Sequence, residues 1–250
     1  MSAAGFHAMR TGWRASWLLI ACFCMPLPSN AQSQQSSNAV SVRELLIPPK
    51  ALRAFDQGLE LLAKKNPAES LQHFQRAIAE YAGYYEAYDR IGAAELKLWR
   101  VPEAEEAFRK SIEVSGSQYA HPLLALGAIL DTQKKFDEAM AVIRKGLDLE
   151  PDSWTGQYYQ GLALFGLDRL AEAEQSVREA LRLNTDFPEA HLLLADIHSR
   201  EADYSSLVGD LNEYLRLAPN GPASARVKAL RESTKVKIQR SQTNTALAQP

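Results

Sequence analysis

Residues 154–187 read W-T-G-Q-Y-Y-Q-G-L-A-L-F-G-L-D-R-L-A-E-A-E-Q-S-V-R-E-A-L-R-L-N-T-D-F, and this stretch decides the fold class. Its apolar residues recur at helical spacing in two blocks. Small residues hold set places in both, with Gly161 in the first block and Ala173 and Ala180 in the second. The larger Val177 lies between those two alanines. The pattern predicts two antiparallel helices that approach closely where the side chains are small.

The same landmarks return along the chain with a period of 34 or 35 residues. The small residue at the place of Gly161 recurs as Gly58, Gly92, Gly127 and Ala195. Three further landmarks follow 12, 16 and 19 residues after each of these positions. They are Ser70, Ala104, Ala139, Ala173 and Leu207, then Phe74, Phe108, Ile143, Val177 and Leu211, and last Ala77, Ser111, Gly146, Ala180 and Tyr214. The one extra residue of the 35-residue interval falls in the turn between Ser115 and Ala120.

This periodic pattern resembles the tetratricopeptide repeat. The resemblance covers residues 51–221 and implies an all-α, right-handed α-solenoid of five helix-turn-helix units plus a C-terminal capping helix. The units are placed at 51–84, 85–119, 120–153, 154–187 and 188–221. Residues 222–240 carry one stripe suited to a capping helix, formed by Ala223, Val227, Leu230 and Thr234. Residues 241–250 are predicted to be a disordered tail.

Capping residues predict where individual helices begin. Asp152 or Ser153 stands before Trp154, and Asp186 stands before Pro188 at the expected first helical position. Short polar side chains accept hydrogen bonds from the free N–H groups of a first helical turn, and proline suits the start of a helix.

The N-terminus is typical of an export signal. Arg10 and Arg14 precede a mostly apolar run over residues 15–28, and Ser29-Asn30-Ala31 provides a small-x-small cleavage site. We predict cleavage after Ala31, so residues 1–31 are a signal peptide and the protein is exported, either periplasmic or secreted. Residues 32–50 are a flexible Gln/Ser-rich linker.

Two other interpretations of the N-terminus stay open. Leu19-Ile20-Ala21-Cys22 resembles the lipobox of bacterial lipoproteins, in which the cysteine becomes lipidated. An uncleaved N-terminus would instead act as an anchor. Either way the chain would be a membrane-held subunit of envelope assembly.

Composition and motifs argue against catalysis and cofactors. The formal net charge is −2, which gives no overall basic field for nucleic acid, and the only cysteines are Cys22 and Cys24. No nucleophile or phosphate-loop motif occurs. His191 and His198 lie seven residues apart on one predicted helix face, but both occupy packing positions, so we predict no metal site. We expect no enzyme activity and no cofactor.

The resemblance also implies where a partner would bind. In this family the first helix of each unit lines the concave groove, and its second, fifth, ninth, twelfth and thirteenth positions point into it. The candidate groove residues are Phe55, Leu59, Glu86, Asp89, Leu124, Asp131, Tyr158, Leu162, Phe165, Leu192, Asp196 and Arg200. This mixture of apolar, aromatic and acidic side chains suits an extended peptide or a helix with apolar anchors and some basic residues.

Alternatives to groove binding also follow from the residues. The segment 43–50 could fold back over the first unit. The cluster Tyr81, Tyr84, Tyr85 and Tyr88 is interpreted as packing at the junction of the first two units. The Lys and Asn clamp of the chaperone-binding members of the family is missing, because positions five and nine hold other residues. The last helix carries six basic residues and one acidic residue between 226 and 240, so membrane contact is expected only there or through the N-terminus.

We therefore predict a non-catalytic, exported scaffold that mediates protein–protein interaction through its concave groove. Its partner would be another protein or an extended peptide segment. The membrane-held envelope-assembly subunit is the alternative.

Overall fold

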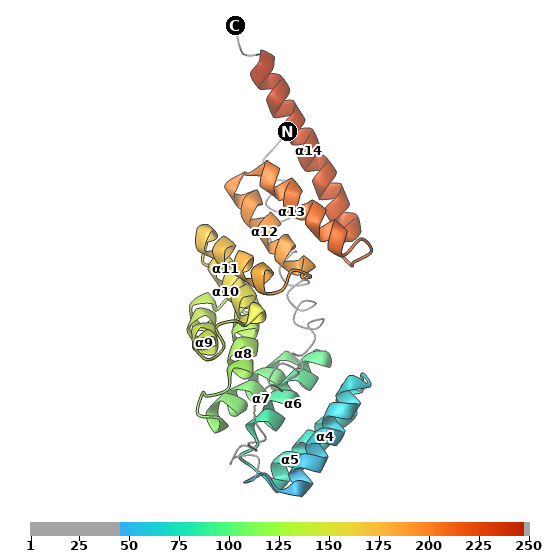
Figure 1. Cartoon of the computed structure of the whole chain (residues 1–250), viewed down its shortest axis with the longest axis vertical. Coiled ribbons are helices and arrows are strands. Elements are labelled where there is room, and N and C mark those ends of the chain that lie inside the picture. Colours follow the sequence, from blue (N-terminus) through green and yellow to red (C-terminus); the bar gives the residue numbers. More distant parts are fainter. Residues whose placement is uncertain (1–45, 248–250) are drawn as a thin grey trace. The chain divides into compact units, whose positions relative to one another are not determined.

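The computed structural model describes residues 46–247, and within them the chain forms eleven helices and no strand. This confirms the all-α fold class. The predicted signal peptide over 1–31 and most of the linker over 32–50 lie outside the described residues. The helices divide into two compact units (Figure 1), of which unit 1 ends at Leu149 and unit 2 begins at Glu150. Within residues 46–247, no helix is long and apolar enough to cross a bilayer.

Unit 1 contains three antiparallel helix pairs. The first helix of each pair packs along the second, and the second helix of one pair contacts the first helix of the next. The pairs are α4 (Pro49–Ala63) with α5 (Pro67–Glu80), α6 (Tyr85–Lys97) with α7 (Val101–Val114), and α8 (Ala120–Thr132) with α9 (Phe136–Leu149).

Unit 2 contains two more pairs and a final long helix. The pairs are α10 (Trp154–Gly166) with α11 (Leu170–Leu183) and α12 (Pro188–Glu201) with α13 (Tyr204–Leu217), and α14 (Ser224–Leu247) packs on α13. First helices thus begin at residues 49, 85, 120, 154 and 188. The connection 115–119 between α7 and α8 has five residues where the other inter-pair connections have four, so the extra residue does lie in that turn.

A large side chain from each second helix fills the space left by a small residue on its partner. A Cβ added to Gly58 would come within 2.5 Å of the Phe74 ring, and one added to Gly92 within 2.7 Å of the Phe108 ring. Gly161 faces Val177 at 2.6 Å in the same way. The five large side chains at this position are fully buried: Phe74, Phe108, Ile143, Val177 and Leu211. Each contributes roughly 1.5–3 kcal/mol through burial of apolar surface.

The turn inside each helix pair repeats one backbone conformation. A single residue adopts a left-handed φ of 59° to 63°, at Lys65, Trp99, Lys134, Asp168 and Ala202. The next residue donates its N–H to a carbonyl five residues back, as Arg169 does to Leu164 at 3.0 Å. This is the Schellman arrangement, and it satisfies carbonyls left free at a helix end. No glycine occupies any of the five positions, although glycine adopts this conformation most easily.

The helix starts follow the capping prediction in one case and depart from it in another. The Ser153 side chain accepts the Gly156 N–H at 3.3 Å, as predicted. Asp186, in contrast, does not cap α12, whose N-cap is Phe187 with no side-chain hydrogen bond. The Asp186 N–H is instead bound by Asn184 at 3.2 Å, because Asn184 forms an Asx turn in the connection.

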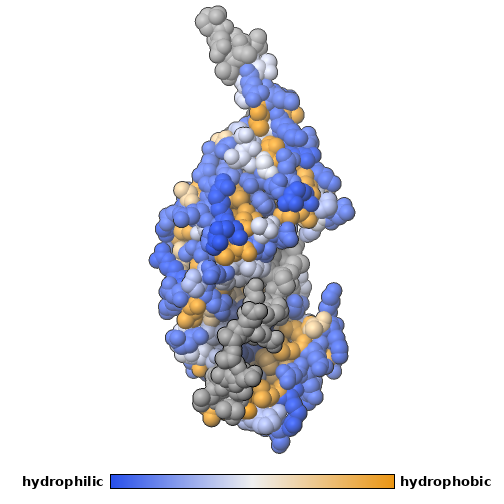
Figure 2. All heavy atoms as spheres, viewed as in Figure 1, coloured by the Kyte–Doolittle hydropathy of each residue, from blue (hydrophilic) through white to orange (hydrophobic). Residues whose placement is uncertain are grey.

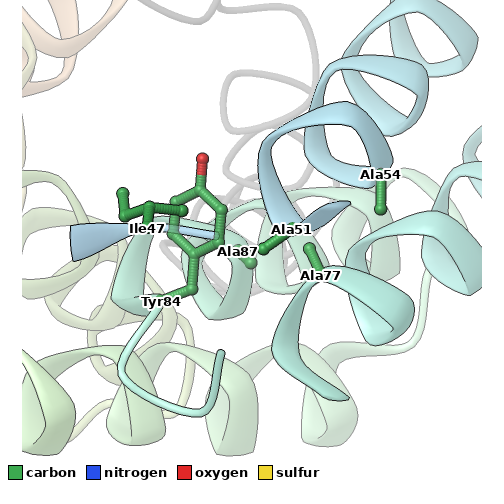
Figure 3. Packing of buried hydrophobic residues seen from close by; sticks show 6 residues of the cluster. All are labelled: Ile47, Ala51, Ala54, Ala77, Tyr84 and Ala87. Atoms are coloured by element: carbon green, nitrogen blue, oxygen red, sulfur yellow. The ribbon is translucent and has the colours of Figure 1, made fainter. Parts of the chain in front are cut away.

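The N-terminal end of unit 1 is covered by residues that lie just before and just after the start of α4. Ile47 is buried with Ala51 and Ala54 of α4, Ala77 of α5 and Ala87 of α6, and the Tyr84 ring lies beside Ile47 (Figure 3). Leu52 and Phe55 pack against this cluster. Part of the segment 43–50 therefore does fold onto the first unit, and Tyr84 is a packing residue as predicted.

The last helix is longer than the sequence pattern predicted. The predicted stripe is buried as expected at Ala223, which directly precedes α14, and at Val227 and Thr234 within it. The helix does not end near residue 240, however, and continues to Leu247, so most of the predicted disordered tail is helical. No glycine or proline occurs between residues 223 and 249, and extending an existing helix adds one hydrogen bond per residue.

Candidate functional site

All twelve candidate groove residues lie on the first helices of their pairs. Unit 1 places Phe55 and Leu59 on α4, Glu86 and Asp89 on α6, and Leu124 and Asp131 on α8. Unit 2 places Tyr158, Leu162 and Phe165 on α10, and Leu192, Asp196 and Arg200 on α12. Their accessibility differs widely. Phe55, Leu59, Glu86 and Asp196 are half-buried, Arg200 is exposed, and the other seven are buried.

The edge of α4 that faces α6 is apolar. Hydrophobic side chains gather there in the space-filling view, whereas the opposite edge of α4 is hydrophilic (Figure 2). Phe55 is fixed on this edge by two rings, with its centroid 4.8 Å from that of Tyr84 and 5.6 Å from that of Phe74. Leu59 follows one helical turn later. This edge offers partly accessible apolar area on a rigid support.

A buried carboxylate–histidine pair joins α6 to α8. Asp89 is fully buried, and its Oδ1 lies 2.6 Å from His121 Nδ1. The Arg90 Nε lies 3.8 Å from Asp89 Oδ2, and the Tyr119 hydroxyl donates to the same oxygen at 3.5 Å. The repeat indicates only that the two residues lie on neighbouring first helices, because they are 32 positions apart, nearly one period.

The remaining unit 1 candidates belong more to the helix interface than to an open surface. Leu124 packs on α9 at Gly146, where an added Cβ would lie 2.6 Å from Leu124 Cδ2. Asp131 is buried near the end of α8. Glu86 is half-buried in the first turn of α6, where a carboxylate is stabilised by the helix dipole.

Aromatic rings dominate the α10 face of unit 2. The Tyr158 ring meets the Phe187 ring edge-on, with centroids 4.7 Å apart, and Trp154 meets the same Phe187 ring at 4.8 Å. Tyr158 lies 6.0 Å from Tyr159. Tyr158 is therefore held by its neighbours, and Leu162 is buried one turn further along α10.

Arg200 closes the other end of this face. Its guanidinium lies 3.9 Å from the centre of the Phe165 ring, a cation–π contact, and Nη1 donates to Asp168 Oδ1 at 2.6 Å. Arg200 thus links the end of α12 to the turn after α10. Arg200 was predicted to point into the groove, but its side chain instead packs against the Phe165 ring.

Carboxylates of α12 vary in environment. Leu192 is buried between half-buried acidic neighbours on the same helix, Glu189 and Asp196. Burial raises the pKa of Glu189, because a charged carboxylate loses hydration there. Glu189 is consequently a weaker acid than an exposed glutamate.

His191 and His198 both face Asp210 of α13. His198 Nδ1 lies 2.7 Å from Asp210 Oδ2, and His191 Nδ1 lies 3.5 Å from Asp210 Oδ1. On its other side His198 Nε2 lies 3.3 Å from Glu174 Oε1 of α11. The sequence pattern identified both histidines as packing residues but did not indicate that carboxylates from two other helices surround them.

Comparison with known proteins agrees with this architecture. The family model "Tetratricopeptide repeat" matches residues 55–120, 124–188 and 158–222. Hsp70-Hsp90 organizing protein 1 from Glycine max is 25% identical over 122 residues, which make up 49% of this chain and 21% of that protein. The chain thus spans about a fifth of that relative's length.

Solved structures share the fold at low sequence identity. MamA from Desulfovibrio magneticus RS-1 has a TM-score of 0.60 at 19% identity, covering 70% of this chain and 99% of that one. YrrB, described as a TPR protein with an unusual peptide-binding site, has a TM-score of 0.56 at 14% identity, covering 72% and 92%. Since the family model matches well over half of the sequence, the chain belongs to the tetratricopeptide repeat family.

Proposed function

We propose that this protein is a non-catalytic scaffold that binds another protein, or an extended peptide segment, along the first helices of its repeats. One observation carries the proposal. Phe55, Leu59 and Glu86 stay partly accessible on two successive first helices of unit 1, while the helix pairs beneath them are tightly interlocked. A rigid surface with apolar and acidic groups at set intervals suits recognition of a chain segment.

The chemistry of the surface favours a partner with apolar anchors and basic residues. The α4 edge supplies hydrophobic area, and the first turn of α6 supplies the Glu86 carboxylate. Unit 2, taken by itself, has a half-buried carboxylate on its own first helix α12, Asp196. Apolar burial would provide affinity, and the carboxylates would select for lysine or arginine in the partner.

The proposed partner differs from a chaperone tail. One relative is an Hsp70-Hsp90 organizing protein, and chaperone-binding members of the family clamp a C-terminal carboxylate with Lys and Asn at the fifth and ninth positions. In unit 1 of this chain those positions hold Phe55 with Leu59, Asp89 with Ala93, and Leu124 with Ala128. Acidic and apolar residues at these places do not attract a carboxylate.

A pull-down with single first-helix variants tests the binding surface. The bait is residues 32–250, crosslinked in envelope extract, beside Leu59→Asp and Glu86→Lys. Glu106→Lys is the matched control, because Glu106 is exposed on the second helix α7. Loss of one prey with both first-helix variants, but not with the control, supports the proposal. Equal capture by all four baits contradicts it.

Tyr158 and Phe165 are less suitable for such a test than the sequence indicated. Both rings are buried, and each is fixed by a neighbour, Phe187 in one case and Arg200 in the other. Alanine at either place would disturb packing of unit 2 as well as any binding. The partly accessible residues of unit 1 avoid this ambiguity.

Export is the second part of the proposal. Support comes from the basic start, the apolar run over residues 15–28 and the Ser29-Asn30-Ala31 site. Mass spectrometry of the protein from cell fractions tests it. A measured mass equal to that of a chain beginning at Gln32 supports export by cleavage. A mass increase from lipid attached at Cys22, which disappears in Cys22→Ala, supports the membrane-held alternative. A cytosolic protein with all 250 residues contradicts both.

A further inference from the structure

His198 lies between carboxylates from two other helices. The residue is 4% exposed. Nδ1 lies 2.7 Å from Asp210 Oδ2, and Nε2 lies 3.3 Å from Glu174 Oε1. An imidazole nitrogen and a carboxylate oxygen are both groups that bind metal cations, so the Nε2–Oε1 pair provides two ligand atoms at one place.

A third ligand group lies at the same place. Glu201 is three residues after His198 on α12 and therefore on nearly the same helix face. One ligand atom each from Glu174, His198 and Glu201 can be chosen so that all lie within 4.8 Å of one another. The group joins a buried imidazole to one half-buried and one exposed carboxylate.

The separation of the ligand atoms has the size that a tetrahedral zinc ion needs. Zinc binds histidine nitrogen and carboxylate oxygen at about 2.0–2.2 Å, so two ligands of a tetrahedral ion lie roughly 3.3–3.5 Å apart. The Nε2–Oε1 distance of 3.3 Å matches this value. Glu201 is exposed, and its side chain is free to close on the same point.

The surroundings of His198 resemble the support that metal-binding histidines receive. Such a histidine donates its second ring N–H to a carboxylate, which fixes the tautomer and the ring orientation. Asp210 Oδ2 lies 2.7 Å from His198 Nδ1, where it can accept such a hydrogen bond. We propose that unit 2 binds one zinc-class divalent ion through Glu174, His198 and Glu201, with Asp210 as the residue that positions His198.

Arg178 competes with this ion. Its Nη2 and Nε donate to Glu174 Oε1 at 2.5 and 2.9 Å, the same oxygen that faces His198. Arg178 must therefore leave that oxygen when metal enters. Its side chain is 62% exposed, so it can move into solvent.

Zinc titration of the full chain, purified without a polyhistidine tag and stripped with chelator, tests the proposal. Competition against a chromophoric zinc chelator gives stoichiometry and Kd. We expect one zinc per chain, at least tenfold weaker binding in His198→Asn and Glu201→Gln, and several-fold tighter binding in Arg178→Ala. Asp210→Asn should weaken binding about tenfold, as loss of a supporting carboxylate does. His73→Asn, a half-buried histidine of α5, is the matched control and should bind like the parent.

Two further readouts keep the test decisive. Glu201→Gln changes an exposed side chain at a helix end, so its circular dichroism spectrum should equal that of the parent even if His198→Asn unfolds. Cobalt(II) bound to the parent should show the strong visible absorption of a tetrahedral site, and Glu201→Gln should lose it. No stoichiometric binding, or equal zinc affinity in the parent and Glu201→Gln, would overturn the proposal and leave His198 as a packing residue in contact with Asp210 and Glu174.

Discussion

Replacing Gly92 by alanine probes the interlocking that holds each helix pair together. The new Cβ would lie 2.7–2.8 Å from three atoms of the buried Phe108 ring, so the ring must move. Overpacking of this kind costs typically 1–3 kcal/mol, and alanine regains about 1 kcal/mol over glycine in a helix. Taking about 2 kcal/mol for the overlap, the free energy of unfolding should fall by about 1 kcal/mol.

A double-mutant cycle with Phe108→Leu separates the two effects. The fifth repeat pairs Ala195 with the buried Leu211, so an alanine–leucine pair fits this architecture. Phe108→Leu alone should cost about 1 kcal/mol. In the double variant the overlap disappears. The cost of about 1 kcal/mol for Phe108→Leu and the gain of about 1 kcal/mol from alanine in the helix then cancel, so its free energy of unfolding should be close to that of the parent. The coupling energy is then about 2 kcal/mol, within the range for residues in contact.

Urea unfolding followed by far-UV circular dichroism measures all four proteins. The reasoning fails if Gly92→Ala is about 1 kcal/mol more stable than the parent, which helix propensity alone would give. It also fails if the two substitutions are additive within about 0.5 kcal/mol.

Three further predictions concern the turns, the capping helix and the buried contact between Asp89 and His121. Lys134→Gly should raise the free energy of unfolding by about 0.5–1 kcal/mol, because Lys134 has a left-handed φ of 62° that costs glycine less. Lys145→Gly, within α9, should lower the free energy of unfolding by about 1 kcal/mol. Thermal melts compare the two variants with the parent. Burial raises the pKa of Tyr214, whose hydroxyl oxygen accepts the Ala223 N–H at 3.3 Å. The parent should therefore lose stability as pH rises above about 10, and Tyr214→Phe should lose less. Urea midpoints of both proteins at pH 8 and 10.5 measure the difference. His121→Ala should lower the free energy of unfolding by about 1–3 kcal/mol, because the buried Asp89 Oδ1 loses its 2.6 Å partner, and an unchanged urea midpoint would contradict this.

The repeat made the fold predictable because its pattern reports packing directly. The residues predicted to fill the gap between paired helices, such as Phe74 and Ile143, are the fully buried ones. Each lies 16 residues after the small residue that receives it, and a clash at any one destabilises its helix pair. Local signals were weaker. Asp186 has the right chemistry for an N-cap, but the Asn184 turn places it elsewhere.

The polar contacts between repeats could not be predicted from single-helix patterns. Asp89 with His121, and His198 with Asp210 and Glu174, bring together side chains from different helices. Helical spacing within one segment shows which face a residue occupies but not which charged group lies opposite. The repeat period shows only that Asp89 and His121 lie on neighbouring first helices, because the residue one full period after Asp89 is Leu124 and not His121.

The candidate groove residues were predicted from their positions within each repeat. The structure shows that several side chains at these positions are less accessible than predicted. Tyr158 and Leu124 occupy groove positions but are buried by their neighbours, whereas Phe55 and Leu59 remain partly accessible. Large side chains on a closely packed first helix fill gaps between helices before they reach solvent.

Site-specific photo-crosslinking in intact cells tests the central claim most directly. A benzophenone amino acid is placed at Leu59 or at Glu86 on the first helices, and at Glu106 or Arg109 on the second helix α7 as controls. The account predicts one adduct of the same mass from both first-helix positions and none from α7. An adduct from the α7 positions alone would contradict binding along the first helices and would place the partner on the opposite helix layer.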